Sequence, residues 1–461
     1  MAKVSSAELG TDSIGKLLVK QALPASIGIL VMSLNILIDS VFVGNWIGSL
    51  AIGAINIVLP ASFFIAALGM AIGIGGASMI SRALGSNREE KALDTFGNQI
   101  SLTVLLTVVL ATVGLSFSDT IVQSFGGKGS IFDPAKIYYQ IVLFGVPFQG
   151  LAMMGSNVVR AEGKPTFAMV GMILPALSNL VLDAVFIYVL DWGMAGAAWA
   201  TTLSTFLSFL FYVWFFISKK SELKISFHHL KFKWHIVKEI ASLGFVTLSR
   251  QAVVSFIYLF LNNILFNLGG EALVSVYAIV GRLLMFVLFP VLGVTQGFLP
   301  IAGYNYGAEK YDRVIEVIKK SIIAAVTLGI VVFAIIYLFP EAFVHLFIDT
   351  SNHLTAQEVE INNFIMTETP TALKIVFAAT PIVAIQLIGA AYFQAVGKAI
   401  PALLLTLTRQ GFFFFPLILI LPNLYGKMGV WAAFPIADTL STIVTAYFLY
   451  REIQKKLLPH T

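Results

Sequence analysis

The chain has 461 residues, of which 58% are hydrophobic and only 11% are charged, and its mean hydropathy is +0.89. Soluble globular proteins carry about 25% charged residues, so this composition excludes a water-soluble fold and favours an all-α integral membrane protein. Cysteine is absent and the six histidines and few acids form no hydrolytic or metal-binding constellation, so we expect neither an enzyme nor a bound cofactor.

Apolar runs long enough to cross a bilayer as helices, about 20 residues each, recur along the whole chain. In the first half they predict spans at 15–43, 51–81, 93–117, 137–159, 166–190 and 194–217. In the second half they predict spans at 240–267, 272–303, 314–339, 371–396, 400–422 and 429–450. The one strongly polar internal stretch lies between the halves. We therefore expect twelve transmembrane helices in two six-helix lobes, residues 1–218 and 240–461, joined by a basic linker, residues 219–239.

The lysines and arginines predict how these spans are oriented. With the N-terminus inside, 22 of the 29 basic residues fall in cytoplasmic segments, and only Lys128, Lys136 and Lys427 fall in outer loops. Cytoplasmic loops of membrane proteins carry such an excess of positive charge. We therefore expect a multi-pass protein of the plasma membrane with both termini and the linker cytoplasmic. The basic residues lie in short loops between spans, which excludes a nucleic-acid partner.

Short matches between the two halves indicate an internal repeat. Gly85 corresponds to Gly307 at an offset of 222 residues, and the Gly163-Lys164 pair corresponds to Gly397-Lys398 at an offset of 234. The extra twelve residues fall in an acidic outer loop between Glu341 and Thr369. Transporters built from two parallel repeats place the substrate between the repeats and rock them in alternation.

Three acids remain at membrane depth: Asp39, Asp183 and Asp438. An ionised carboxylate in hydrocarbon costs at least ~2.5 kcal/mol, so it normally faces a cavity or a partner. Asp39 follows Asn35, and Asp183 follows Asn179, in the same Asn-x-x-x-Asp pattern. Since residues i and i+4 share a helix face, each helix presents an amide and a carboxylate one turn apart.

Such a face suits two kinds of chemistry: the carboxylates could take up and release protons, or they could coordinate sodium together with amide and hydroxyl oxygens. The residues alone leave both open. At the repeat offsets, Asp39 corresponds to Leu261 and Asp183 to Leu417, so we expect the cation site in the first half only. Pro24 interrupts the first predicted span, where it is either a static kink or a hinge.

The twelve spans, the acid pair in the first and fifth spans and the Glu162-Gly163-Lys164-Pro165 turn resemble the multidrug and toxic compound extrusion (MATE) family, nearest its DinF-like branch. The resemblance implies export of amphipathic, often cationic compounds, driven by a proton or sodium gradient. It implies a cation site, with sodium as a candidate metal ion, at Asp39, Asn179, Asp183 and Thr201. It also implies accessory substrate contacts at Asn35, Tyr138, Gln149 and Asn157, and a hinge at Pro24.

Arg250, Arg282 and Arg409 also lie at membrane depth, in the second half. They either reach toward lipid or indicate anionic or zwitterionic substrates. A flippase of lipid-linked substrates is the nearest alternative to a drug exporter. A passive ion channel is the alternative from another class, although no repeated filter loop or ring of acids is present. We expect a monomer whose partners are small amphipathic molecules and membrane lipids.

Overall fold

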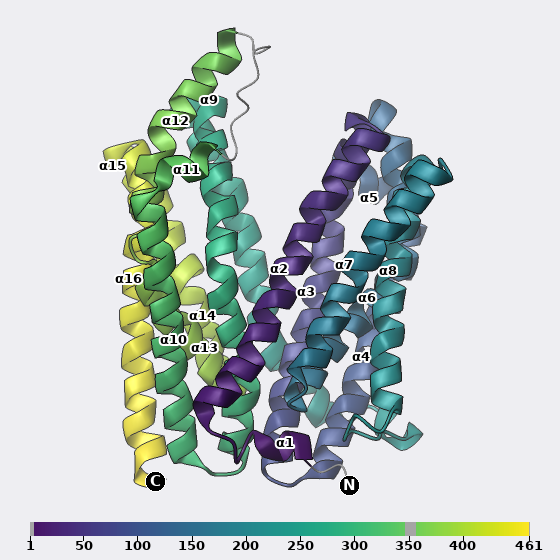
Figure 1. Cartoon of the computed structure of the whole chain (residues 1–461), viewed down its shortest axis with the longest axis vertical. Coiled ribbons are helices and arrows are strands. Elements are labelled where there is room, and N and C mark those ends of the chain that lie inside the picture. The colour runs from purple at the N-terminus through teal and green to yellow at the C-terminus, as the bar shows by residue number, and fades with distance from the viewer. Residues whose placement is uncertain (1–3, 346–355, 461) are drawn as a thin grey trace. The chain divides into compact units, whose positions relative to one another are not determined.

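The computed structural model describes residues 4–345 and 356–460, and this part of the chain contains helices and no β-strand (Figure 1). The α-helices of the first half are α1 (Val4–Glu8), α2 (Ile14–Trp46), α3 (Ser49–Gly85), α4 (Glu89–Ser116), α5 (Ser118–Ser124), α6 (Phe132–Ala161), α7 (Pro165–Asp183) and α8 (Gly193–Ile217). Those that follow are α9 (Trp234–Gly307), α10 (Tyr311–Leu338), α11 (Pro340–His345), α12 (Ala356–Val376), α13 (Thr380–Ala395), α14 (Ala399–Leu407), α15 (Phe415–Tyr425) and α16 (Lys427–Glu452).

Shorter helical segments connect or extend these helices. The 3-10 turns are η1 (Gly129–Ile131), η3 (Phe227–Leu230) and η6 (Leu458–His460). The π-helical segments are η2 (Ala184–Val189), η4 (Thr408–Phe414) and η5 (Ile453–Leu457). Because η2 continues α7, η4 joins α14 to α15 and η5 continues α16, three of the membrane-length helices contain a π-helical turn.

The predicted twelve spans are confirmed by the helices of the described residues. Ten helices are individually long and apolar enough to cross a membrane, and α12 with α13 forms a further span bent by 49°. One of the ten, α9, contains two helices, because Gly270 adopts φ 62° and ψ −155° and interrupts it. That conformation is nearly closed to residues with a side chain, so Gly270 sets the turn between the seventh and eighth spans.

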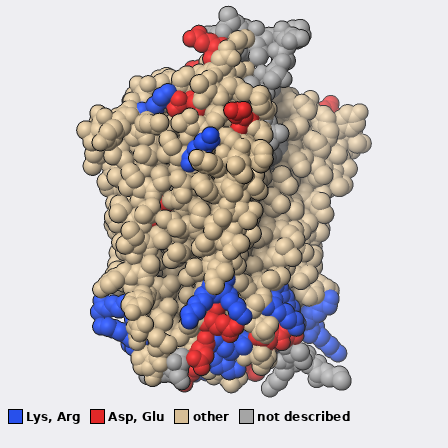
Figure 2. All heavy atoms as spheres, turned by 60° about the vertical axis from the view of Figure 1, so that its left-hand side comes forward, with Lys and Arg blue, Asp and Glu red and all other residues tan. Residues whose placement is uncertain are grey.

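The helices are organised in two compact units. Unit 1 contains residues 1–248, 299–310 and 395–397, and unit 2 contains 249–298, 311–394 and 398–461. Each unit has its own apolar core: buried side chains such as Val43, Leu143 and Val146 in unit 1, and Phe377 and Trp431 in unit 2. Figure 2 shows a broad uncharged band between charged ends on one face of the protein, as a lipid-facing surface requires.

The turns that end α6 and α13 have the same geometry, as the repeat predicts. Gly163 (φ 75°) and Gly397 (φ 83°) both adopt the left-handed conformation that favours glycine after a helix. The next residue then closes the turn: the Lys164 amide donates to the Val159 carbonyl and the Lys398 amide to the Phe393 carbonyl. Pro165 can begin α7 directly because the first helical residue needs no amide donor.

The acidic segment between Glu341 and Thr369, predicted as an outer loop, is largely helical where it is described. It contains α11 and most of α12, and residues 346–355 lie outside the described part. Ile361, Phe364 and Ile365 share one face of α12 and pack against the core of unit 2. This apolar face stabilises a helix that hydropathy alone does not reveal, because most of its other residues are polar.

Residues 219–239, the predicted linker, are fixed on unit 1 rather than extended. The buried Asn98 side chain of α4 accepts a hydrogen bond from the Lys233 amide at 2.8 Å and donates to the Lys231 carbonyl at 3.2 Å. Lys233 also forms an ion pair with Asp94. One turn of α4 therefore binds the linker through its backbone.

Candidate cation and substrate site

Unit 1 contains a cavity of about 400 Å³ between α2, α3, α6, α7 and α8. All five helices contribute side chains, and most of the lining is apolar. Six of the residues predicted from the sequence line it: Asn35, Asp39, Tyr138, Gln149, Asn179 and Thr201. Residues from four spans that are separated along the chain are thus brought to a single cavity, and every one of them belongs to unit 1.

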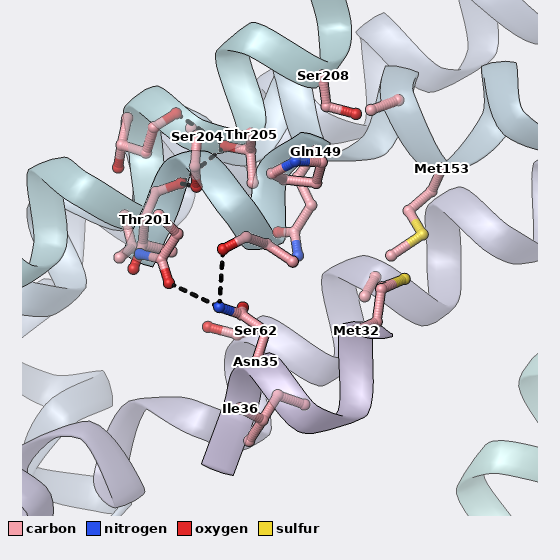
Figure 3. A pocket seen from close by; sticks show the side chains of 18 of the residues that line it. Met32, Asn35, Ile36, Ser62, Gln149, Met153, Thr201, Ser204, Thr205 and Ser208 are labelled. Carbon is pink, nitrogen blue, oxygen red and sulfur yellow. Dashed lines mark hydrogen bonds between the residues drawn. The ribbon is translucent and has the colours of Figure 1, made fainter. Parts of the chain in front are cut away.

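The two asparagines of the repeated pattern bind each other across α2 and α7. The Asn35 Nδ2 atom donates to Asn179 Oδ1 at 3.1 Å and to the Ala176 carbonyl at 3.2 Å, as Figure 3 shows. Asn179 is buried, and its own Nδ2 atom has no hydrogen-bond partner among the described residues. A buried amide donor without a partner costs roughly 1–3 kcal/mol, so this site favours a bound acceptor such as water.

The two acids lie beside these asparagines. Asp183, the last residue of α7, is fully buried, and neither of its carboxylate oxygens meets a hydrogen-bond donor in good geometry among the described residues. The charged group that interacts with it is the carboxyl group of Asp39. Two adjacent carboxyl groups without a basic partner cannot both remain ionised in an apolar setting, so the pair requires a proton or a metal cation.

Hydroxyl groups complete this set of oxygen atoms. Tyr138 is buried and interacts with Thr201, Asp39 and Asp183, while the Thr201 Oγ1 atom donates to the Ala197 carbonyl at 3.1 Å. Carboxylate, amide and hydroxyl oxygens are the donors that hard cations prefer. The group therefore fits a sodium ion, and it equally fits a proton shared between the acids.

The remaining predicted residues lie outside the cavity. Asn157 is buried in α6, where its side chain donates to the Met153 carbonyl at 2.9 Å and accepts from Arg160 at 3.4 Å. It contacts helix and arginine rather than the cavity. Pro24 lies within α2, which remains helical from Ile14 to Trp46, and it is not among the cavity-lining residues.

Sequence reasoning missed a row of hydroxyl side chains on α8. Ser204, Thr205 and Ser208 follow Thr201 at i+3, i+4 and i+7, so all four share one helix face, and all four line the cavity (Figure 3). This spacing is visible in the sequence and could have identified the face. Their hydroxyls satisfy backbone carbonyls; Ser208, for example, donates to the Gly171 carbonyl at 2.7 Å.

Four methionines, Met32, Met70, Met153 and Met172, also line the cavity. Methionine is flexible and polarizable, so such a wall adapts to ligands of different shape and contacts aromatic rings favourably. No spacing rule distinguishes these methionines from ordinary buried ones, because they come from four different helices.

The third intramembrane acid belongs to unit 2. Asp438 on α16 is buried and pairs with Arg409 of η4, with 2.6 Å between Arg409 Nε and Asp438 Oδ1. Arg282 is exposed. Asp438 therefore serves as the counterion of an arginine, unlike the two acids in unit 1.

Comparison with known proteins places the whole chain among described transporters. The sequence model of the MatE family matches residues 24–185 and 248–420. The chain is 27% identical to the multidrug export protein MepA of Staphylococcus haemolyticus, over 95% of this chain and 94% of that protein. It is 27% identical to MepA of Staphylococcus aureus strain NCTC 8325, covering 93% and 92% of the two chains.

A solved structure has the same fold. It is the outward-facing conformation of a multidrug resistance MATE family transporter of the MOP superfamily. The TM-score is 0.89 and the sequence identity 26%, and the superposition covers 98% of this chain and 99% of that one.

Proposed function

Because this chain belongs to the MatE family of membrane transporters, we propose that it exports amphipathic, often cationic organic compounds by alternating access, driven by inward movement of protons or sodium ions. The observation that carries the proposal is the pair of adjacent acids beside a large apolar cavity in unit 1. The similarity to multidrug export proteins favours an exporter over a passive channel.

The cavity supports a broad substrate range. Its lining offers methionine sulfur, aromatic carbon and one face of hydroxyl groups, with Asp39 as the charged residue among the lining side chains. Apolar area and adaptable contacts bind different flat molecules without a fixed hydrogen-bond pattern, and a carboxylate favours a cationic centre. Sites of this kind select for shape and charge rather than for one compound.

The acid pair supports coupling. When Asp39 and Asp183 carry a proton or a sodium ion, their charge is neutralised and the polar end of the cavity is less attractive to a cation. When the two acids release the proton or sodium ion, a cationic compound can bind in its place. A substrate and a coupling ion that compete for one group of oxygens are exchanged rather than bound together, which is the requirement for antiport.

Further parts of the proposal concern orientation and movement. The charge distribution supports cytoplasmic termini and a location in the plasma membrane. Pro24 removes one backbone hydrogen bond within α2, the helix that contributes Asn35 and Asp39, so a change of bend there would move both residues. The hydroxyl groups of Tyr138 and Thr201 would supply further oxygen atoms around the bound cation. A single chain contains all of these residues, so a monomer suffices for this transport cycle.

Transport by the purified protein in liposomes tests the proposal. Movement of a cationic dye such as ethidium is measured under an imposed proton gradient and, separately, an imposed sodium gradient. We expect saturable transport with at least one gradient and its loss in Asp39→Asn and Asp183→Asn, because an amide keeps the size of the side chain but cannot release a proton or balance a cation.

Asp133→Asn is the matched control, since Asp133 is an exposed acid at the start of α6. It should transport like the parent protein. All variants should elute from a size-exclusion column at the volume of the folded parent protein. Parent-like transport in both acid variants would show that coupling occurs elsewhere. Discrete unitary currents in planar bilayers, together with no dye movement in liposomes, would show that the protein is a channel and not an exporter.

A further inference from the structure

Arg250 is an intramembrane cation with no counterion among the residues that the structure describes. It lies on α9 in unit 2, it is only partly exposed, and it forms no hydrogen bond or ion pair with a described residue. The charge that acts on it is that of another cation, Arg409. The segments that carry the two arginines pack together, since a Cβ atom on Gly411 of η4 would lie 3.9 Å from Val253 of α9. Charged residues inside a membrane normally pair with an opposite charge or line a pathway, so an unpaired arginine beside a second arginine requires an explanation.

Three charged residues occupy the same depth in unit 2. Arg250 follows Glu239 by eleven residues, Arg409 follows Lys398 by eleven, and Asp438 follows Lys427 by eleven. At 1.5 Å per residue each is about 16 Å from the charge at the end of its span, which is half of a hydrocarbon core of about 30 Å. An arginine side chain cannot reach the headgroups over that distance, so snorkelling does not account for Arg250.

The charges of this group do not cancel. Arg409 binds Asp438 through two contacts, Nε to Oδ1 at 2.6 Å and Nη2 to Oδ2 at 3.4 Å. Asp438 is thereby occupied, and Glu368 in the middle of α12 is paired with Lys427. One positive charge remains, and it belongs to Arg250.

We propose that Arg250, together with Arg409, forms an anion-binding site at mid-membrane depth in unit 2, which takes the carboxylate, sulfonate or phosphate group of an amphipathic molecule. The guanidinium group of Arg250 is a planar fork that binds such groups through two parallel hydrogen bonds. Asp438 orients Arg409 and sets the net charge of the site at one. Arg409 lies in a π-helical turn, a distortion that occurs frequently at functional sites.

This inference deepens the proposed function and rests on it for one point, that the bound molecule is transported. It widens the substrate class: compounds with an anionic group would bind in unit 2 in addition to the cations that the acids of unit 1 favour. The anionic group could belong to a soluble compound or to a membrane phospholipid, since both present the same oxygen atoms.

Binding of two dyes that differ by one anionic group tests the site. Anilinonaphthalene sulfonate and uncharged N-phenylnaphthylamine share their aromatic rings. Fluorescence titration uses the full-length protein in nanodiscs of phosphatidylcholine, with empty nanodiscs as the blank. We expect Arg250→Gln to lower the affinity for the sulfonate dye roughly tenfold, because one charge-assisted contact is lost. The affinity for the uncharged dye should not change. Arg250→Lys, which keeps the charge, should recover part of the affinity.

Arg282→Gln is the matched control: the same change at an exposed arginine of α9, expected to bind both dyes like the parent protein. Thermal unfolding without dye separates binding from folding. Because Arg250 has no described partner to lose, Arg250→Gln should unfold at the temperature of the parent protein or above it. If Arg250 instead stabilised the fold, its replacement would lower the unfolding temperature. The proposal would be overturned if Arg250→Gln bound the sulfonate dye with the parent affinity, or if it lost affinity for both dyes to the same extent.

Nanodiscs that contain phosphatidylglycerol distinguish the two sources of the anion. If this lipid competes with the sulfonate dye in the parent protein but not in Arg250→Gln, the site binds lipid phosphate; without competition it binds soluble anions. Either result supports the site. The measurement needs no ion gradient, so failure of gradient-driven export leaves this test intact.

Discussion

Glu162 is a buried acid outside the membrane spans, in the turn between α6 and α7. It is fully buried, its Oε1 atom accepts from the Ser221 hydroxyl at 2.8 Å, and its Oε2 atom accepts from the Glu222 amide at 3.0 Å. Glu222 in turn accepts hydrogen bonds from Ser6 of α1. Two acidic side chains thus join these elements: Glu162 binds the α6–α7 turn to the linker, and Glu222 binds the linker to the N-terminal helix.

Burial raises the pKa of Glu162 from its ordinary value of 4.5 to about 7, against the opposing effect of its two hydrogen bonds; the charge of Glu222 adds to the rise and Lys164 opposes it. The folded protein therefore binds more protons than the unfolded chain between these values. The contribution of Glu162 to the free energy of unfolding should be largest below pH 4.5 and be lost as pH rises through 7, by about 3 kcal/mol at most.

We predict that Glu162→Gln removes this part of the pH dependence. The unfolding temperatures of the parent protein and the variant are measured at pH 5 and at pH 8. The difference between the unfolding temperatures at these two pH values should be smaller in the variant. Asp133→Asn, at an exposed acid, should retain the parental difference. An unchanged difference in Glu162→Gln would mean that another group titrates.

At the residue scale, the sequence could identify what stands out chemically. Asp39 and Asp183 are rare charges in apolar helices, and the shared Asn-x-x-x-Asp spacing indicated that the asparagines accompany them, as the Asn35–Asn179 hydrogen bond shows. Asn157 was expected as an accessory substrate contact, and in the structure its side chain accepts a hydrogen bond from Arg160. Which way a polar side chain of an all-apolar helix points depends on packing, and no pattern in the sequence encodes it.

At the scale of elements, the linker is held to α4 by very close packing. A Cβ atom on Gly97 would lie 2.3 Å from the His229 carbonyl oxygen, a backbone atom that cannot turn aside. Asn98, the next residue, makes the hydrogen bonds to Lys231 and Lys233. Contact of this kind requires both a glycine and an amide at consecutive positions.

We predict that Gly97→Ala releases the linker, because overpacking a tight contact costs roughly 1–3 kcal/mol. Limited trypsin digestion of the protein in nanodiscs should then cut after Lys231 and Lys233 faster than in the parent protein. Gly281→Ala is the control, since its nearest neighbour would be the Tyr258 hydroxyl at an ordinary 3.5 Å. Equal cleavage rates in Gly97→Ala and the parent protein would show that the linker is held by other contacts.

Elements differ in how much of them hydropathy predicts. The spans were predictable because lipid requires long apolar helices with every backbone group bonded internally. The part of α12 that precedes the predicted span at 371 was not, since among its described residues the contacts with the core come from Ile361, Phe364, Ile365 and Met366. The π-helical turn η4 was not either, because a helix with one extra residue in a turn has no composition of its own.

At the scale of the whole molecule, sequence distance conceals how close some segments lie. The repeat-related glycines Gly85 and Gly307 pack against each other within unit 1: a Cβ atom on Gly85 would lie 2.0 Å from the Tyr304 carbonyl oxygen, and one on Gly307 would lie 2.1 Å from that of Arg82. The sequence aligned these glycines as equivalent positions. The contact between the two helix ends depends on packing, which the matched positions in the sequence do not reveal.

The orientation of unit 1 is the last prediction. The Ser6–Glu222 hydrogen bonds place α1 and the linker at one end of this unit, and α4, at 28 residues and about 42 Å, leads from the region of the linker to the opposite end, where Lys128 follows α5. Because the basic residues gather at the linker end, we expect that end to be cytoplasmic.

Single cysteines in this cysteine-free chain test the orientation with an impermeant maleimide. Phe227→Cys reports on the linker, where Phe227 is 91% exposed, and Lys128→Cys reports on the opposite end, where Lys128 is also exposed. In intact cells position 128 should be labelled and position 227 should react only after the membrane is permeabilised. Each variant is the control for the other, because a reversed orientation would exchange the two results and a leaky membrane would label both. Labelling of position 227 alone in intact cells would place the linker and the N-terminus outside, and the cations that drive export would then have to approach the acid pair from the other side.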